Sequence, residues 1–295
     1  MKIAPTHIGF AGLGKMGKAI VGLLLSSGHK VTVWNRSPDA VQELVAKGAV
    51  AASNPAELAK ADFLLTMLAN DAATRSVVVD HGVLDAAHPG LIHINLATVS
   101  VALAKELAEL HRQRKVGYVA APVFGRPDAA AAGKLNIVVA GDPAIVAKAQ
   151  PILDAIGQKT WPVGDKPENA NVVKIAGNFM IASAIETMGE AVALTRSHGV
   201  KADAFLDILT NTLFAAPAYK LYGGLIAAEK YQPAGFAAPL ALKDVRLALS
   251  AADDNNVPMP FANVLRDSLM ELIATGGGDD DWVAMARVAA RRAGL

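Results

Sequence analysis

The sequence predicts a doubly wound α/β domain followed by an all-α domain, joined by a long linking helix. Short apolar runs alternate with helical patterns in the first half, which is typical of a parallel sheet with helices on both faces. After residue 164 the strand signals nearly vanish and long helical patterns follow. The chain has 295 residues, more than one domain usually contains. We therefore expect two domains, residues 1–164 and residues 165–295.

Apolar runs predict the strands of the sheet domain. These runs are His7–Ala11, Lys30–Trp34, Ala49–Ala51, Phe63–Met67, Leu91–Asn95, Gly117–Ala120, Leu135–Ala140 and Lys159–Val163. Helical patterns lie between most of them: Met16–Leu25, Ala40–Lys47, Val101–Arg114 and Pro143–Ile156. Asn54-Pro55 predicts the start of a further short helix, and Ser100 is placed to cap the helix that follows it. We expect the last two strands to extend the sheet.

The second half is predicted to be helical. The pattern from about Asn169 to His198 contains no proline and ends at Gly199, which suits a helix C-cap. At ~1.5 Å per residue this helix would be roughly 45 Å long, so we expect it to link the two domains. Further helices are predicted at Asp203–Thr212, Leu221–Glu229, Leu240–Asp253, Pro260–Thr275 and Trp282–Arg292.

A glycine motif connects the first predicted strand to the first helix: Gly12-Leu13-Gly14-Lys15-Met16-Gly17. The strand before it, the helix after it and the second strand on schedule form the context that the dinucleotide fingerprint of Rossmann folds requires. Gly12 allows the tight turn, Gly14 lets a pyrophosphate approach the backbone, and Gly17 lets helix and strand pack closely. The anion would face free N–H groups at the helix N-terminus. We expect all six residues to line a dinucleotide site.

The residues after the second strand predict that the bound dinucleotide is NADP(H). NAD-binding versions of this fold carry an acidic residue there, which holds the ribose 2′-hydroxyl. This chain has Asn35-Arg36-Ser37 instead, and its first acidic residue is Asp39. Arg36 would grip a 2′-phosphate through its planar guanidinium, while Asn35 and Ser37 add neutral hydrogen bonds. The alternative is an exposed loop arginine with no ligand.

The composition excludes several other classes of protein. The net charge is +1, with 28 basic and 27 acidic residues, so there is no electrostatic footprint for nucleic acid. The chain contains no cysteine, and its seven histidines show no metal-ligand spacing, so no metal site is expected. No stretch of about 18 continuous apolar residues predicts a membrane span. We see no signal peptide, and a cytoplasmic enzyme is the default expectation.

The long helix carries two polar residues that we expect to be catalytic. Lys174 and Asn178 are four residues apart and therefore point the same way, among residues that are nearly all apolar. The simplest alternative is a lysine at the helix edge with its amine in water. If the lysine instead lies in a cleft, partial desolvation would lower its pKa and make it a proton donor near neutral pH. Asn178 would then orient the same substrate oxygen.

Further candidates lie in loops at the carboxyl ends of strands, where such folds bind ligands. Leu68-Ala69-Asn70 and Thr98 would line the nicotinamide half of the cofactor, although either loop is equally explained by an ordinary turn or helix cap. After the sixth strand, Phe124-Gly125-Arg126 offers close backbone approach at Gly125 and a guanidinium for a substrate anion. Lys243-Asp244 is explained most simply as a surface ion pair of little energetic value.

With these residues in view, the chain resembles the β-hydroxyacid dehydrogenase family over essentially its full length. That family includes 3-hydroxyisobutyrate dehydrogenases, tartronate semialdehyde reductases and glyoxylate/succinic semialdehyde reductases. The run from Gly9 to Gly17 is similar to the family's N-terminal signature, and Asn35-Arg36-Ser37 is similar to its NADP-preferring members. The resemblance implies a C-terminal domain like that of 6-phosphogluconate dehydrogenase, and association as dimers or tetramers.

The resemblance also implies roles for single residues. Thr98 falls where the family's threonine contacts the nicotinamide end, and Lys174 and Asn178 fall on its catalytic lysine and substrate-binding asparagine. Lys243 matches the lysine of the C-terminal Lys-Asp motif, which lies near the cofactor. The substrate loop departs from the usual Ala-Pro-Val-Ser-Gly-Gly, because Phe124 replaces the serine and Arg126 replaces the second glycine.

We therefore expect a homodimeric, NADPH-dependent reductase of a small aldehyde or ketone, or in reverse a dehydrogenase of a 3-hydroxyacid. Lys174 would act as general acid and base. An imine reductase of the same fold is the alternative that Phe124 favours, although imine reductases usually carry Asp or Tyr at the position of Lys174. A further alternative is a sensor that binds NADPH without catalysis. The cleft with Lys174 and Asn178 makes an enzyme the leading hypothesis.

Overall fold

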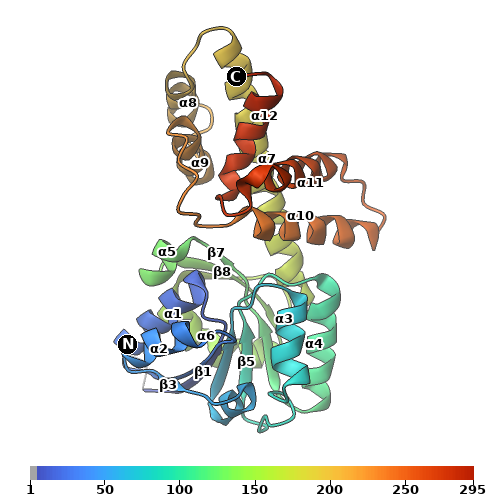
Figure 1. Cartoon of the computed structure of the whole chain (residues 1–295). Coiled ribbons are helices and arrows are strands. Elements are labelled where there is room, and N and C mark those ends of the chain that lie inside the picture. The colour runs from blue at the N-terminus through green and yellow to red at the C-terminus, as the bar shows by residue number, and fades with distance from the viewer. Residues whose placement is uncertain (1–4) are drawn as a thin grey trace. The chain divides into compact units, whose positions relative to one another are not determined.

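A computed structural model describes residues 5–295, and these residues divide into two compact units. The first unit ends at Lys174 and the second comprises Ile175–Leu295. The boundary falls inside one helix, α7 (Glu168–Ser197), which is the long linking helix that the sequence predicts (Figure 1). Gly199 follows it with φ of +83°, as expected for a C-cap glycine.

The first unit is built on one twisted sheet whose strands follow the order β3-β2-β1-β4-β5-β6-β8-β7, with β9 paired to β8. The strand bounds are β1 His7–Ala11, β2 Lys30–Trp34, β3 Val50–Ala51, β4 Phe63–Thr66, β5 Ile92–Asn95, β6 Gly117–Ala120, β7 Val123–Phe124, β8 Leu135–Gly141 and β9 Gly157–Pro162. The strands from β3 to β6 are all parallel, which confirms the predicted doubly wound core.

The last strands extend the sheet with a change of direction. β8 runs antiparallel to β6, and the short strand β7, which the sequence does not reveal, pairs antiparallel with β8. A parallel return would need a crossover of a dozen or more residues, usually a helix. The only helix between β6 and β8 in the described chain is α5 (Pro127–Ala131), which is too short for that crossover.

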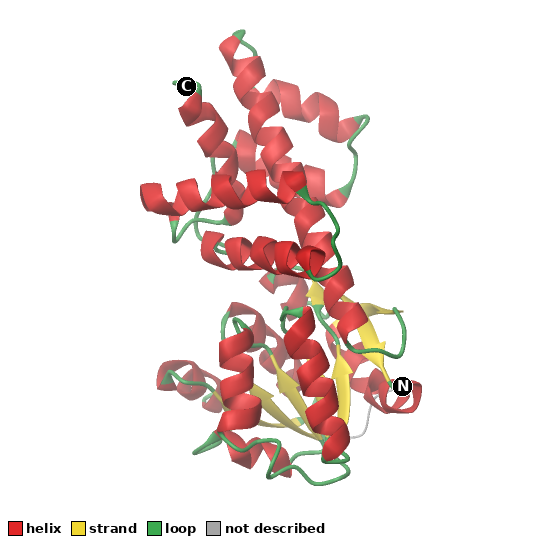
Figure 2. Ribbon diagram, turned by 90° about the vertical axis from the view of Figure 1, so that its right-hand side faces the viewer, coloured by secondary structure: helices red, strands yellow, loops and turns green. Residues whose placement is uncertain are grey.

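Helices cover both faces of the sheet and create two apolar layers (Figure 1). One face packs against α1 (Lys15–Ser26), α2 (Pro38–Val45) and α6 (Pro143–Ile156). The other packs against η1 (Pro55–Lys60), η2 (Ser76–Asp80) and α4 (Val101–Gln113), and α3 (Asp71–Arg75) leads directly into η2. The Ser100 hydroxyl accepts a hydrogen bond from the Leu103 N–H at 2.9 Å, which confirms the predicted cap. Figure 2 shows the strands lying between these helices.

The second unit is helical, as predicted. Its elements after α7 are α8 (Ala202–Asn211), α9 (Pro217–Ala227), α10 (Ala238–Asp253), α11 (Pro260–Leu272), η3 (Ile273–Gly277), η4 (Trp282–Met285) and α12 (Ala286–Arg292). They share one apolar core, in which Trp282 packs edge-on against Tyr222 and Phe236. Across the part of the chain that the structure describes, no helix is both long and apolar enough to span a membrane.

Candidate active site

The glycine turn after β1 has the geometry of an anion cradle. Gly12 has φ of +98°, and a Cβ on Gly17 would collide with the carbonyl oxygen of Gly12, so both positions require glycine. Gly14 precedes α1, whose first N–H groups have no partner within the helix. Among the described residues, no atom beyond its chain neighbours lies within 4 Å of the position a Gly14 Cβ would take. The turn from Gly12 through Leu13, Lys15 and Met16 to Gly17 therefore leaves open space beside Gly14.

The end of β2 is tied to this turn by one side chain. The Asn35 Oδ1 accepts a hydrogen bond from the Leu13 N–H at 3.0 Å, and its Nδ2 donates to the Ser37 carbonyl at 3.1 Å. Asn35 thus fixes the glycine turn relative to the next loop. Arg36 and Ser37 are exposed beside it, at the edge where the ribose of a dinucleotide lies in this fold.

The loops that follow β4 and β5 are linked to each other. Asn70 caps α3 by accepting a hydrogen bond from the Ala73 N–H at 2.9 Å. The next residue, Asp71, accepts from the Ser100 N–H at 2.9 Å and so joins the two loops. Leu68 and Thr98 are half-buried at the same carboxyl edge of the sheet as the glycine turn, while Ala69 is exposed.

The substrate loop brings Phe124 and Lys174 together. Phe124 ends β7, and Gly125 follows with φ of +147°, which requires glycine. Arg126 is partly buried at the N-cap position of α5. The Lys174 Nζ lies 4.1 Å from the centre of the Phe124 ring, and Lys174 is only 9% exposed. Its ammonium is therefore not the solvated helix-edge cation of the alternative reading.

In the second unit Asn178 belongs to a buried polar cluster. The Asn178 Nδ2 donates to the Asp244 Oδ2 at 2.5 Å, and the Lys243 Nζ lies 2.8 Å from the Asp244 Oδ1. Asp244 is 3% exposed. The surface ion pair considered from the sequence is therefore wrong for Lys243 and Asp244, because the carboxylate is buried and holds Asn178 as well.

Sequence reasoning missed two buried polar residues near these candidates. The sequence places Asp244 beside Lys243 and does not reveal its contact with Asn178. Asn171 stands three residues before Lys174 on the buried side of α7 and is 1% exposed. Within residues 5–295 neither polar atom of its side chain has a hydrogen-bond partner. The spacing of Asn171, Lys174 and Asn178 at i, i+3 and i+7 was the available signal, because it puts all three on one face of a helix.

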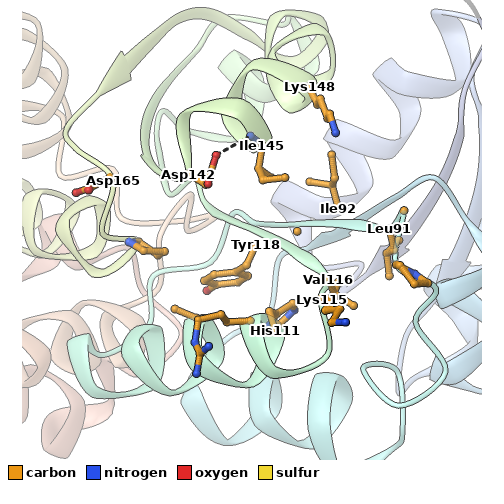
Figure 3. Close-up of a pocket in the computed structure, with 16 residues that line it drawn as sticks. Leu91, Ile92, His111, Lys115, Val116, Tyr118, Asp142, Ile145, Lys148 and Asp165 are labelled. Atoms are coloured by element: carbon orange, nitrogen blue, oxygen red, sulfur yellow. Dashed lines mark hydrogen bonds between the residues drawn. The ribbon is translucent and has the colours of Figure 1, made fainter.

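A separate cavity of about 420 Å³ lies at the amino ends of the strands, opposite the carboxyl ends that carry the glycine turn (Figure 3). Its walls include the starts of β5 and β6, the end of α4 and the start of α6, with His111, Lys115 and Lys148 among the lining residues. None of the site residues predicted from the sequence lines it. Among the described residues, no group of three His, Asp or Glu side chains is arranged to hold a metal ion.

Comparison with known proteins agrees with this geometry. The sequence model of the NAD binding domain of 6-phosphogluconate dehydrogenase matches residues 7–164. The model described as NAD-binding of NADP-dependent 3-hydroxyisobutyrate dehydrogenase matches residues 169–289. The chain belongs to the β-hydroxyacid dehydrogenase family. As a member of that family it is an oxidoreductase that acts on CH–OH groups with a nicotinamide cofactor, and the predicted enzyme class is confirmed.

Other members of the β-hydroxyacid dehydrogenase family are similar over nearly the whole chain. An uncharacterized oxidoreductase of Bacillus subtilis is 38% identical, covering 95% of this chain and 98% of that protein. Glyoxylate/succinic semialdehyde reductase 1 of Arabidopsis thaliana is 34% identical, covering 95% and 96%. The crystal structure of a 3-hydroxyisobutyrate dehydrogenase from Salmonella typhimurium has a TM-score of 0.86 at 26% identity, covering 96% and 99%.

Proposed function

We propose that this chain is an NADPH-dependent reductase of small aldehydes or ketones that uses Lys174 as general acid, and in reverse a 3-hydroxyacid dehydrogenase. The observation that carries the proposal is the burial of the Lys174 ammonium against the ring of Phe124 in the substrate loop. Burying a cation costs free energy, and buried charged groups gather at functional sites, so the buried lysine beside the substrate loop supports a role in the chemistry.

The preference for NADPH rests on the end of β2. Arg36 and Ser37 are exposed there, and a carboxylate in that loop would repel a 2′-phosphate, whereas a guanidinium binds it with charge-assisted hydrogen bonds. Asn35 contributes indirectly, because it holds the glycine turn in register with this loop. The turn itself, Gly12 to Gly17, would take the pyrophosphate against the α1 N-terminus.

At the reacting end the cofactor supplies a hydride, and the chain supplies the proton. Lys174 would donate that proton to the carbonyl oxygen as negative charge grows on it, which typically contributes about 10² to 10⁴ in rate. Asn178 is one helical turn away on the same helix and would hydrogen-bond the same oxygen. Gly125 and Arg126 would hold the distal end of the substrate. We further propose that Leu68, Ala69, Asn70, Thr98 and Lys243 complete the cofactor site.

Imine reduction is the second candidate, and Phe124 is the observation that favours it. An aromatic ring stands where a hydroxyl would hold a substrate carboxylate, so the loop suits a bulkier or less polar carbonyl or an imine. Lys174 favours the carbonyl, because a lysine is suited to protonating an alkoxide oxygen. Cyclic imines assayed beside glyoxylate and short semialdehydes separate the two reactions.

We propose in addition that residues 1–164 bind the cofactor, that residues 165–295 carry substrate-binding and dimer contacts, and that the enzyme works as a cytoplasmic homodimer. Large apolar side chains are exposed on the helical unit: Met180, Leu194, Ile208 and Leu213. Exposed apolar surface of this kind marks protein interfaces. Light scattering coupled to size exclusion gives the mass that tests the dimer.

The cofactor preference and the reaction are tested together by steady-state kinetics. We expect a higher kcat/KM with NADPH than with NADH in the natural protein. Arg36→Ala should lower kcat/KM for NADPH by about 10- to 100-fold and leave that for NADH nearly unchanged, since charged hydrogen bonds contribute about 1.5–3 kcal/mol. A natural preference for NADH, or equal effects of Arg36→Ala on both cofactors, would overturn the assignment of NADPH.

A further inference from the structure

A network of buried polar side chains runs along the α4-covered face of the sheet in the first unit. The His111 Nε2 lies 2.9 Å from the His93 Nδ1, and the His93 Nε2 lies 2.8 Å from the Thr66 Oγ1. The Thr66 hydroxyl is 3.1 Å from the Asn95 Oδ1, which also accepts a hydrogen bond from the Ala97 N–H at 3.1 Å. None of the four side chains is more than 1% exposed. The network thus joins α4 to β5 and β4 and returns to the end of β5.

Its two ends lie at opposite edges of the sheet. His111 lines the cavity at the amino ends of β5 and β6, where Figure 3 shows it beside Tyr118. Asn95 is the last residue of β5, and the N–H that it holds belongs to the loop Leu96-Ala97-Thr98. That loop lies at the carboxyl edge, where parallel sheets of this kind bind their ligands.

Burying such a network costs free energy of desolvation, which apolar side chains at the same positions would not. Neighbouring side chains make further contacts with the network. The His93 and His111 rings stack with centres 5.0 Å apart, and the Asn95 Nδ2 donates to the Tyr118 hydroxyl at 3.2 Å. Buried networks with this degree of connection fix side-chain positions more rigidly than single hydrogen bonds do.

The direction of each hydrogen bond in the network can be assigned from His111. The His111 Nδ1 must donate to the Leu107 carbonyl, 2.6 Å away, because a carbonyl only accepts. In a neutral pair the His111 Nε2 then accepts from the His93 Nδ1, and the His93 Nε2 accepts from the Thr66 hydroxyl. The single hydroxyl proton of Thr66 is therefore shared between two acceptors, the His93 Nε2 and the Asn95 Oδ1. The bond to His93 thus fixes the orientation of the Thr66 hydroxyl that reaches Asn95.

We propose that His111, His93, Thr66 and Asn95 form a positioning network that fixes the Leu96–Thr98 loop for the nicotinamide half of the cofactor. The inference rests on the proposed cofactor site, of which Thr98 is a member. None of the four residues needs to touch the cofactor. Their effect passes through the Asn95 Oδ1 and the Ala97 N–H, so it should be felt at the nicotinamide end and not at the adenosine end.

The test is a binding titration with two probes, in which the protein's intrinsic fluorescence reports binding. NADPH reports both ends of the site, and adenosine 2′,5′-bisphosphate reports only the adenosine end. Thr66→Val keeps the shape of the side chain and removes its hydroxyl. We expect it to weaken NADPH binding about three- to tenfold, the effect of one lost hydrogen bond, and to leave bisphosphate binding within about twofold of the natural protein. Thr66→Ser should restore NADPH binding.

A matched control exists in the same sheet. The Thr32 Oγ1 on β2 lies 2.9 Å from the His7 Nε2 on β1, so Thr32→Val also removes a threonine hydroxyl bonded to a histidine. We expect Thr32→Val to leave the affinity for NADPH unchanged. Thermal unfolding of each variant then shows that a change in affinity is not a general loss of stability.

A second variant tests the far part of the network and serves if Thr66→Val does not fold. His93→Leu removes the ring nitrogen that fixes the orientation of the Thr66 hydroxyl and breaks the link to His111. It should weaken NADPH binding selectively, and in the double variant with Thr66→Val the two losses should be less than multiplicative, as coupling within one network requires. Fully multiplicative losses would overturn the role of the histidines.

The outcomes separate this inference from the proposed function. If the natural protein binds NADPH and both variants bind it equally well, the network has no positioning role and the inference alone fails. If the variants weaken both probes equally, the effect is on the whole fold and the inference also fails. If the natural protein binds neither probe, the proposed cofactor site fails and takes the inference with it.

Discussion

The Lys174 Nζ lies 4.1 Å from the centre of the Phe124 ring, and both residues belong to the first compact unit. A cation over an aromatic face gains about 2 kcal/mol when it is desolvated, as Lys174 is at 9% exposure. The ring therefore holds the ammonium beside the substrate loop, at the position where the family pattern has a serine.

Replacing this ring should lower turnover. Phe124→Leu keeps an apolar side chain and removes the π face, so we expect kcat to fall about 5- to 30-fold as Lys174 loses its fixed position. Phe124→Tyr retains the ring and should stay within about threefold of the natural enzyme. Steady-state kinetics on the best carbonyl substrate measures both, and equal rates for the Leu and Tyr variants would remove the ring from the account.

The buried carboxylate of the second unit should be important for stability. Asp244→Ala leaves the Lys243 ammonium and the Asn178 amide without the oxygen atoms that they bond, and breaking a buried ion pair costs about 3–5 kcal/mol. Urea unfolding followed by circular dichroism measures the loss. Asp254→Ala, at the exposed end of α10, is the control and should change the free energy of unfolding by less than about 0.5 kcal/mol. Equal losses in the two variants would contradict a structural role for Asp244.

Asn171 should show a trade-off between stability and ligand binding. Its buried amide has no hydrogen-bond partner within residues 5–295, and such a group costs about 1–3 kcal/mol. Asn171→Leu keeps the branched shape of the side chain and removes its two polar atoms, so we expect the ligand-free protein to become more stable while kcat/KM falls. Calorimetry and kinetics on one preparation decide the matter. A variant that is both less stable and fully active would show that Asn171 is a packing residue only.

The sequence predicts the fold well where its signals are long. β1, β2 and β6 begin and end where the apolar runs do, and α6 matches its predicted range. The sequence does not predict the shorter elements. β7 has two residues, too few to show alternation, and the irregular helix η2 contains a Val-Val-Val run that resembles a strand.

The site is predicted in the same uneven way. Lys174 stands out because it is the one cation in an apolar stretch of helix, and the glycine motif is recognisable from its context. Asp244 and the network of Thr66, His93 and Asn95 are hidden, because one polar residue in an apolar segment does not reveal its partner. Their partners come from other strands and helices, so only tertiary structure brings them together.

The buried histidines should make stability depend on pH in a defined direction. Burial lowers the pKa of His111 from 6.5 to about 4 and that of His93 well below 6.5. Between pH 6.5 and pH 4 the unfolded chain therefore binds more protons than the folded chain, and the free energy of unfolding falls as the pH falls. His111 alone contributes about 3 kcal/mol over this window.

The groups that face His111 are His93 from β5, Tyr118 from β6 and Arg114 after α4, and Arg114 lowers the pKa of His111 further. Urea unfolding at several pH values measures the profile. His111→Phe should flatten it, whereas replacing the exposed His198 should not. A profile that stays equally steep without His111 would place the titration elsewhere.

The most direct test of the account is single-turnover hydride transfer, followed by NADPH absorbance, in Lys174→Ala beside the natural enzyme. Lys166→Ala, at an exposed lysine near the start of α7, is the control. We predict that Lys174→Ala slows the reaction by about 10² to 10⁴ while NADPH binds with unchanged affinity, because only the proton donor is lost. A rate for Lys174→Ala equal to that of the control would contradict proton donation by this ammonium.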